Sequence, residues 1–197
     1  MFIRKGRKMK LGAVILAGGK SRRMGEDKAE LKTGGRSFLE IISGELSGFD
    51  ELLLSVDDAG RYTGSKLCRV GDVFPGCGPM GGLHAALTAC NSDVLLAVSC
   101  DLPLFTKALG ESLCAGLAEG YDAVVPKTDD GRIHPLCAVY RKSCAAVFEK
   151  FLAGGNYRMT DALKAMNVKY INGLDDRQLQ NINTREEYSL LLEKGDG

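Results

Sequence analysis

Residues 11–28 read LGAVILAGGKSRRMGEDK, an apolar run that passes directly into a glycine-rich, cationic loop. Leu11–Leu16 has the length of one strand, and unbroken apolar runs of this kind occur where a sheet is covered on both faces. Gly18, Gly19 and Gly25 lack the Cβ atoms that would keep a ligand away from the backbone. Because parallel α/β sheets bind ligands beyond the carboxyl ends of their strands, we expect a binding site in this loop.

The loop is also rich in positive charge. Its four cations lie within nine residues: Lys20, Arg22, Arg23 and Lys28. Backbone amides, Arg forks and a Lys point charge together suit a triphosphate, and Lys28 is placed to reach back over it. The loop is not a Walker A motif, because that motif needs glycine five positions before Gly19 and Val14 stands there. The fingerprint G-x-G-x-x-G is absent as well, and a solvated surface loop is the alternative interpretation.

Strand-length and helical patterns alternate along the rest of the chain. The runs of strand length are Leu11–Leu16, Glu51–Val56, Asp93–Ser99, Tyr121–Val125, Pro135–Tyr140 and Val168–Ile171. Capping boxes at Ser37–Glu40 and Thr184–Glu187 open a helix to about Leu46 and a C-terminal helix. Further helical patterns lie at Met80–Cys90, Thr106–Ala118, Lys142–Leu152 and Met159–Met166. This alternation predicts a single α/β domain, a three-layer α/β/α arrangement around a mostly parallel, Rossmann-like sheet.

The chain has 197 residues and a formal net charge of +1, which fits one domain and excludes a uniformly basic surface for nucleic acid. Five of its 26 Lys and Arg residues lie in the first ten positions, which leaves 21 cations against 25 acids in the remainder. We therefore expect residues 1–10 to be a disordered basic tail and residues 11–193 to be the domain. No apolar run approaches the roughly 20 residues of a membrane span. No signal-peptide cleavage site follows the short apolar run that begins at Leu11.

The cysteines carry a separate expectation. They are scattered without C-x-x-C spacing, at positions 68, 77, 90, 100, 114, 137 and 144. This spacing argues against a zinc knuckle or a redox dithiol. We expect free thiols that mostly act as small buried apolar groups, as is usual in a reducing cytoplasm.

Residues 16–28 as a whole resemble the signature L-A-G-G-x-S-x-R-M-G-x-D-K of the molybdenum cofactor guanylyltransferases, and the resemblance continues in order to about Leu192. It implies a nucleotide-diphospho-sugar-transferase-like fold. It also implies an enzyme that joins the GMP part of Mg-GTP to the phosphate of molybdopterin and releases pyrophosphate. Lys28 and Arg23 would then stabilise charge on the leaving pyrophosphate. The residues that would hold the guanine and ribose are Leu16, Ala17, Gly18 and Gly19.

A second family-like segment, residues 76–83, reads GCGPMGGL and resembles the turn G-P-x-G/A-G-L/M. Small residues that lead into a helix let a flat base lie against the backbone, and the amides of a helix N-terminus favour anions. The resemblance implies nucleotide contacts from Gly78, Gly81 and Asp72. The alternatives are an ordinary helix start and an ordinary loop aspartate. At Ser55 the chain departs from the family, which often has Asn there, and Ser makes its hydrogen bonds with shorter reach.

Residues 94–103 read VLLAVSCDLP, an apolar strand that ends near Asp101. A carboxylate at that position is a hard oxygen ligand for Mg²⁺, which also binds nucleotide phosphates. The family has C-D-x-P here, and the resemblance implies that Asp101 holds Mg²⁺, contacts the nucleotide and is catalytic. A Walker B strand is the alternative.

The remaining family-like segments belong to the side of the second substrate. Residues 132–140 resemble x-H-P-L-x-A-x-Y, and residues 181–184 resemble N-x-N-T. They imply contacts with molybdopterin from His134, Asn181 and Asn183, and a further matching segment, residues 156–158, adds Arg158. The attacking phosphate is already an anion, so His134 has no evident proton to move. We interpret His134 as a binding or architectural residue.

Several alternatives stay open. Relatives that act on CTP tend to show L-A-A-G in the first loop, so Gly18 and Gly19 favour guanine. Sugar-phosphate nucleotidyltransferases end that loop in Pro-Lys, which is missing here. Lys28 and Asp101 disfavour a nucleotide-sensing module without turnover, and Val14 disfavours a P-loop switch protein. As partners we expect other cofactor-biosynthesis proteins and molybdoenzymes or their chaperones, with the chain a monomer or a weak homo-oligomer.

Overall fold

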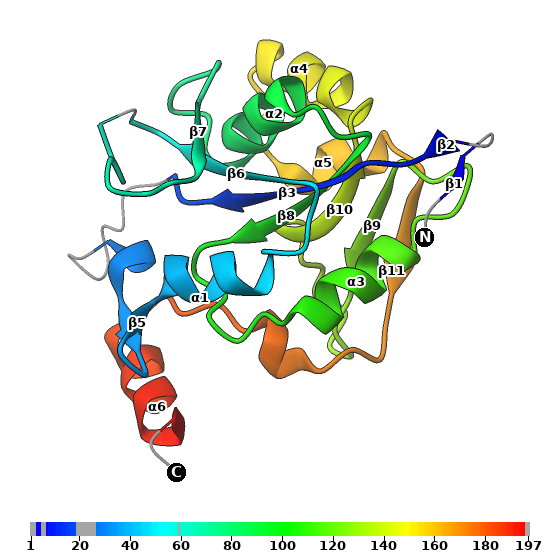
Figure 1. Ribbon diagram of the computed structural model, residues 1–197. Helices are drawn as coiled ribbons and strands as arrows, with labels where there is room; N and C mark the ends of the chain where they lie inside the picture. Colours follow the sequence, from blue (N-terminus) through cyan, green and yellow to red (C-terminus); the bar gives the residue numbers. More distant parts are fainter. Residues whose placement is uncertain (1–2, 5–6, 19–26, 59, 196–197) are drawn as a thin grey trace.

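The centre of the molecule is one seven-stranded sheet. A computed structural model of the chain describes residues 3–4, 7–18, 27–58 and 60–195 (Figure 1). The strands are β3 (Leu11–Leu16), β6 (Glu51–Val56), β7 (Cys68–Gly71), β8 (Val94–Ser99), β9 (Ala123–Pro126), β10 (Cys137–Arg141) and β11 (Val168–Ile171). Their order is β11-β9-β10-β8-β3-β6-β7, and every neighbouring pair is parallel except the two pairs that β10 makes. The predicted α/β fold with a mostly parallel sheet is confirmed.

Helices cover both faces of this sheet (Figure 1). They are α1 (Phe38–Glu45), α2 (Pro79–Ala89), α3 (Lys107–Ala115), α4 (Cys144–Ala153), α5 (Met159–Lys164) and α6 (Arg185–Gly195). Ala13 and Ile15 of β3 pack with α1 and α3 on one face of the sheet. Val14 and Leu16 point the other way and pack with α2, α4 and α5, as the two-residue period of a strand requires. The predicted three-layer arrangement is therefore confirmed.

Both predicted capping boxes begin helices. Ser37 Oγ accepts a hydrogen bond from Glu40 N (3.2 Å), and Ser37 N donates to Glu40 Oε2 (2.7 Å). Before α6, Thr184 Oγ1 accepts from Glu187 N (3.2 Å), and Thr184 N donates to Glu187 Oε2 (3.0 Å). Each box gives partners to amides that the first helical turn leaves without them, so the start of both helices is fixed by sequence.

The C-terminal helix α6 packs against residues 31–38 instead of the main sheet. Beside it lies a hairpin of two short strands, β4 (Lys32–Thr33) and β5 (Arg36–Ser37) (Figure 1). Leu31, Phe38, Ile182 and Leu191 form a small buried cluster between them. Tyr188 packs against the cluster, and its hydroxyl donates a hydrogen bond to Lys32 O (2.6 Å). This docking fixes the segment that precedes α6.

The sequence patterns missed β7 and misjudged some strand ends. None of the four residues of β7 is buried, so this edge strand carries no apolar alternation to detect. The run predicted as Tyr121–Val125 is β9 at Ala123–Pro126, and the run predicted from Pro135 is β10 from Cys137. Within the expected basic tail, β1 (Ile3–Arg4) and β2 (Arg7–Lys8) pair antiparallel outside the main sheet. The expected disorder of that tail stays a prediction.

Two further observations concern thiols and membranes. All seven cysteines are free, and five of them are buried, as predicted. Cys68 is exposed and Cys77 is half-buried. Within the part of the chain that the structure describes, no helix is both long enough and apolar enough to cross a bilayer.

We predict that Ile182 anchors the segment before α6. Its side chain is 1% exposed, so Ile182→Ala should lower the free energy of unfolding by about 2–4 kcal/mol, through lost burial and a residual cavity. Chemical denaturation measures this change. Leu190→Ala on α6 is the control, because Leu190 is 53% exposed and should change little. Equal losses for the two variants would contradict the anchoring role.

Candidate active site

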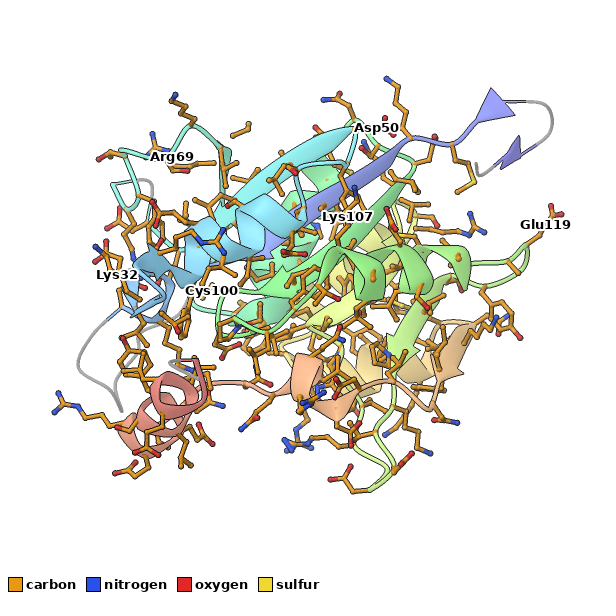
Figure 2. The ribbon with its side chains drawn as sticks, turned by 60° about the horizontal axis from the view of Figure 1, so that its bottom comes forward. Lys32, Asp50, Arg69, Cys100, Lys107 and Glu119 are labelled. Atoms are coloured by element: carbon orange, nitrogen blue, oxygen red, sulfur yellow. The ribbon has the colours of Figure 1, made fainter. Side chains whose placement is uncertain are left out.

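The candidate site lies where β3, β6 and β8 end. These strands run parallel in register, so Leu16 at the end of β3 lies across from Ser55 on one side and Ser99 on the other. Cys100 and Lys32 lie at this end of the molecule, whereas Glu119 lies at the opposite end (Figure 2). The edge formed by the three strand ends is the position that open α/β sheets use for ligands.

The centre of this edge is an ion pair between Lys28 and Asp101. Lys28 Nζ lies 3.0 Å from Asp101 Oδ2, and the two side chains are 18% and 13% exposed. Asn181 Nδ2 donates to Asp101 Oδ1 (2.6 Å), and Lys28 Nζ also donates to Asn183 Oδ1. The structure thus brings together four predicted site residues from three distant parts of the chain.

Backbone contacts hold both members of the pair in place. Cys100 N donates to Leu16 O (3.1 Å), and Ile182 N donates to Asp101 O (2.9 Å), so Asp101 is tied to β3 and to the segment before α6. Lys28 begins η1 (Lys28–Glu30), a 3-10 helix whose N-cap is Asp27. Asp27 Oδ1 accepts from Ala29 N (3.1 Å). The ion pair therefore forms between two segments whose backbones are already fixed.

A second group of predicted residues surrounds the first turn of α2. Gly78 is its N-cap with φ +67°, a conformation that favours glycine. A Cβ atom on Gly81 would lie 2.9 Å from Phe74 O and 3.6 Å from Asp72 Oδ2, so the turn fits closely around the carboxylate. Burial raises the pKa of Asp72, and the neighbouring Asp57 raises it further. This part of the site is a partly buried, acidic wall that suits hydrogen-bond donors of a ligand.

The predicted residues at the strand ends differ in accessibility. Leu16 and Ala17 are 6% and 2% exposed, whereas Gly18 is exposed. Ser55 is 1% exposed, and a Cβ atom on Gly82 would lie 2.5 Å from Ser55 Oγ. The Ser55 hydroxyl therefore packs beneath α2, which leaves it almost no surface for a ligand. Gly19 and Arg23, two further predicted site residues, lie outside the described residues.

His134 lies in the loop between β9 and β10. It is buried, with 8% of its surface exposed. Its backbone is fixed, because His134 N donates to Pro126 O (3.0 Å) and Cys137 N donates to His134 O (3.0 Å). Its Nε2 atom is buried and has no hydrogen-bond partner among the described residues. Burial lowers the pKa of His134, and Arg132 lowers it further, so the ring is neutral near pH 7.

Arg158 does not join the ion-pair cluster in any contact between described residues. It is exposed at the N-cap of α5, where Arg158 N donates to Asn156 Oδ1 (3.0 Å). Its neighbour Tyr157 shares a hydrogen bond with Cys77, and this contact raises the pKa of Tyr157. Arg158 thus lies on a segment that borders the loop before α2.

Sequence reasoning missed a second charged network, formed by Asp27, Asp57, Arg61 and Tyr62. Arg61 donates to Asp27 Oδ2 and to Asp57 Oδ1, the latter at 2.7 Å. Tyr62 Oη lies 2.6 Å and 2.7 Å from the two oxygens of Asp27. Arg61 and Asp27 are 34 positions apart, in turns without periodicity, so only the fold could reveal the network.

The described residues hold no cluster of three His, Cys, Asp or Glu side chains with the geometry of a metal site. A single carboxylate is nevertheless consistent with Mg²⁺, which proteins commonly bind through one or two carboxylates plus substrate phosphates. Asp101 supplies such an oxygen beside the cationic Lys28. The residues present fit a metal ion that arrives with a triphosphate.

Comparison with known proteins gives consistent matches. The MobA-like NTP transferase domain family matches residues 13–168. A probable molybdenum cofactor guanylyltransferase from Clostridium perfringens is 34% identical over 196 residues, covering 94% of this chain and 98% of that protein. The protein of the same name from Bacillus subtilis is 34% identical over 194 residues, covering 94% of this chain and 96% of its own length.

Solved structures agree. Molybdopterin-guanine dinucleotide biosynthesis protein A from Archaeoglobus fulgidus superposes with a TM-score of 0.83 at 25% identity, covering 93% of this chain and 97% of that one. A 2-C-methyl-D-erythritol 4-phosphate cytidylyltransferase from Thermus thermophilus has a TM-score of 0.72 at 16% identity, covering 96% of this chain and 100% of that one. The second likeness concerns the fold alone. The predicted fold is thereby confirmed a second time.

We predict that Asp72 lowers the stability of the protein without ligand. Its raised pKa means that the folded state binds the proton more tightly than the unfolded state does. Stability therefore falls as pH rises from the pKa of Asp72 in the unfolded state to its pKa in the folded state. Asp72→Asn should therefore raise Tm near pH 7, weaken nucleotide binding, and leave Tm unchanged where the carboxyl is protonated in both states, below about pH 3, well under the usual Asp pKa of about 3.9. Thermal melts at the two pH values measure this.

Glu119→Gln provides the control, because Glu119 is exposed at the opposite end of the molecule (Figure 2). Its Tm should match the wild type at both pH values. A lower Tm for Asp72→Asn near pH 7 would contradict the interpretation of the acidic wall.

Proposed function

This chain belongs to the MobA-like NTP transferase domain family, and we propose that it transfers GMP from GTP to the phosphate of molybdopterin, releasing pyrophosphate. The single observation that carries this proposal is the joining of Lys28, Asp101, Asn181 and Asn183 at the carboxyl edge of the sheet. These residues provide a cation, a metal-binding carboxylate and two orienting amides at one point. Catalysis of nucleotidyl transfer depends mainly on such positioning of the reactants and on neutralisation of their charge.

The nucleotide side of the site is the region between the first loop and α2. Gly18 leaves the backbone open to a ligand, and the first turn of α2 offers amides that favour anions. Asp72 supplies acceptor oxygens for N–H or ribose O–H donors. We assign the guanine and ribose to this region, which includes Gly19, and Arg23 to the leaving pyrophosphate.

Lys28 is the cation for the leaving pyrophosphate. Its ammonium group binds Asp101 and Asn183, and these two contacts hold it at the site. A fixed charge needs no reorganisation when negative charge develops on the leaving group. Asp101 would hold Mg²⁺, and that ion supplies further neutralisation of phosphate charge when bound.

The second substrate needs no general base, because its attacking phosphate is already an anion. His134 carries a buried Nε2 that has no partner in the described part of the chain, which suits a hydrogen bond to the ligand. We therefore assign His134 to molybdopterin binding and not to proton transfer. Asn181 and Asn183 orient Asp101 and Lys28 and border the acceptor phosphate, and Arg158 contributes positive charge from the start of α5.

We further infer a cytoplasmic setting and a limited set of partners. Seven free thiols are typical of a protein in a reducing compartment. The product cofactor would pass to other cofactor-biosynthesis proteins and to molybdoenzymes or their chaperones. The working form is a monomer or a weak homo-oligomer.

The experiment that tests the proposal compares nucleotides. Purified protein is incubated with molybdopterin, Mg²⁺ and GTP or CTP, and the products are identified by mass. We expect the guanine dinucleotide and pyrophosphate with GTP. A cytosine dinucleotide alone would assign the chain to the CTP-dependent reaction. GTP binding without pyrophosphate release would identify a binding module and overturn the proposal.

We predict that Asp101→Ala and Lys28→Ala each lower turnover by at least about tenfold to a hundredfold, because removing one group that stabilises developing charge costs about a hundredfold or more in kcat. Steady-state assays of pyrophosphate release measure the loss. Lys107→Ala is the matched control, because Lys107 forms an exposed ion pair with Glu111 (3.8 Å) on α3. Near-normal turnover of a folded Asp101→Ala protein would contradict the metal role of Asp101.

A further inference from the structure

The turn that follows β6 contacts Asp27, the residue directly before Lys28. Arg61 and Tyr62 both contact the carboxylate of Asp27, and Arg61 Nη2 also donates to Tyr62 Oη (2.9 Å). Tyr62 Oη lies within 2.7 Å of both Asp27 oxygens. Arg61 CZ lies 5.0 Å from the centroid of the Tyr62 ring, so the cation also covers the face of the ring. Three side chains therefore form one closed contact.

The backbone of this turn is held in an unusual conformation. Tyr62 has φ +55°, and within the described residues it alone, apart from glycines, has a positive φ. Such a conformation costs free energy and persists only where surrounding contacts enforce it. Arg69 of β7 supplies one such contact, donating from Nη1 to Arg61 O (3.2 Å). Strain of this kind is concentrated at functional sites.

Tyr62 and Arg61 each keep the protonation state in which they can donate a hydrogen bond to Asp27. Burial raises the pKa of Tyr62, and the hydrogen bond to Asp27 raises it further. Burial lowers the pKa of Arg61, but its hydrogen bonds to Asp27 and Asp57 outweigh this and raise it overall. Tyr62 therefore stays a neutral donor and Arg61 stays a cation throughout the physiological pH range.

Asp27 connects these contacts to Lys28, because it caps the short helix that Lys28 begins. Its carboxylate caps η1, where Oδ1 accepts from Ala29 N, and its carbonyl accepts from Glu30 N (3.0 Å). Lys28 is the first residue of that helix and directs its amine to Asp101 and Asn183. A shift of Asp27 would move the base of the Lys28 side chain, and a misplacement of about 1 Å can cost roughly a hundredfold in rate.

We infer that Arg61 and Tyr62 are positioning residues that hold Asp27 and thereby aim Lys28 at Asp101 before the nucleotide binds. This inference rests on the proposed role of Lys28 in the transfer reaction. It assigns a function to the turn after β6, whose residues do not touch the ion pair in any contact between described residues. The strained backbone of Tyr62 is maintained for this alignment.

The test begins with Tyr62→Phe, which removes the hydroxyl and keeps the ring. We expect kcat to fall about tenfold while KM for GTP changes little, because the loss concerns alignment and not uniform binding. Tyr170→Phe is the control, since it also removes a tyrosine hydroxyl, from an exposed position on β11 that is outside the α6 cluster. Its kcat should remain that of the wild type. Wild-type kcat for Tyr62→Phe overturns the inference.

The double variant Tyr62→Phe/Lys28→Ala separates positioning from general stability. If Tyr62 acts through Lys28, its substitution causes no further loss of kcat once Lys28 is gone. The same tenfold loss in both backgrounds overturns the inference.

Hydrogen exchange supplies a readout that does not depend on turnover. Amides of residues 27–31 should exchange faster in Tyr62→Phe and at the wild-type rate in Tyr170→Phe. Unchanged exchange in Tyr62→Phe overturns the inference. A wild-type protein that makes no product from GTP refutes the proposed function instead, and exchange over residues 27–31 still decides whether Tyr62 holds the segment.

Discussion

The ion pair between Lys28 and Asp101 is the contact on which the carboxyl edge of the sheet depends. Partly buried charges lose solvation, and their attraction compensates only when further hydrogen bonds satisfy the remaining groups. Asn181 and Asn183 provide those bonds, one to each member of the pair. The site thus holds Lys28 and Asp101 in mutual contact. In the proposed reaction Lys28 would contact the triphosphate instead, and Asp101 would contact the metal ion.

The fold makes this contact possible by bringing distant segments to one edge. The parallel strands β3 and β8 place Leu16, at the end of β3, beside Cys100, the residue before Asp101, and residues 181–183 return to the same point because Ile182 N donates to Asp101 O. The cluster under α6 fixes that return, because Ile182 is buried while its two neighbours face the pair. A C-terminal helix outside the sheet is therefore part of the site's construction.

The sequence predicted the centre of the site better than its surroundings. Lys28 and Asp101 follow apolar strands in recognisable motifs, so both the alternation of elements and the motif residues could be read in advance. The Asp27–Arg61–Tyr62 contact could not, because it joins turns that only tertiary folding brings together. Ser55 was expected at a nucleotide contact, yet its side chain is buried under Gly82. Periodicity shows which residues form a strand, but not which hydroxyl a neighbouring helix covers.

The most direct test of the central ion pair is a metal titration without nucleotide. Mn²⁺, followed by electron paramagnetic resonance, is titrated into the wild type and into Lys28→Met, with Asp101→Ala as the control that should bind least. Lys28→Met keeps the length of the side chain and removes the cation from Asp101 Oδ2. We predict that Lys28→Met binds Mn²⁺ more tightly than the wild type while losing turnover. Equal or weaker Mn²⁺ binding by Lys28→Met would contradict the role given to the pair.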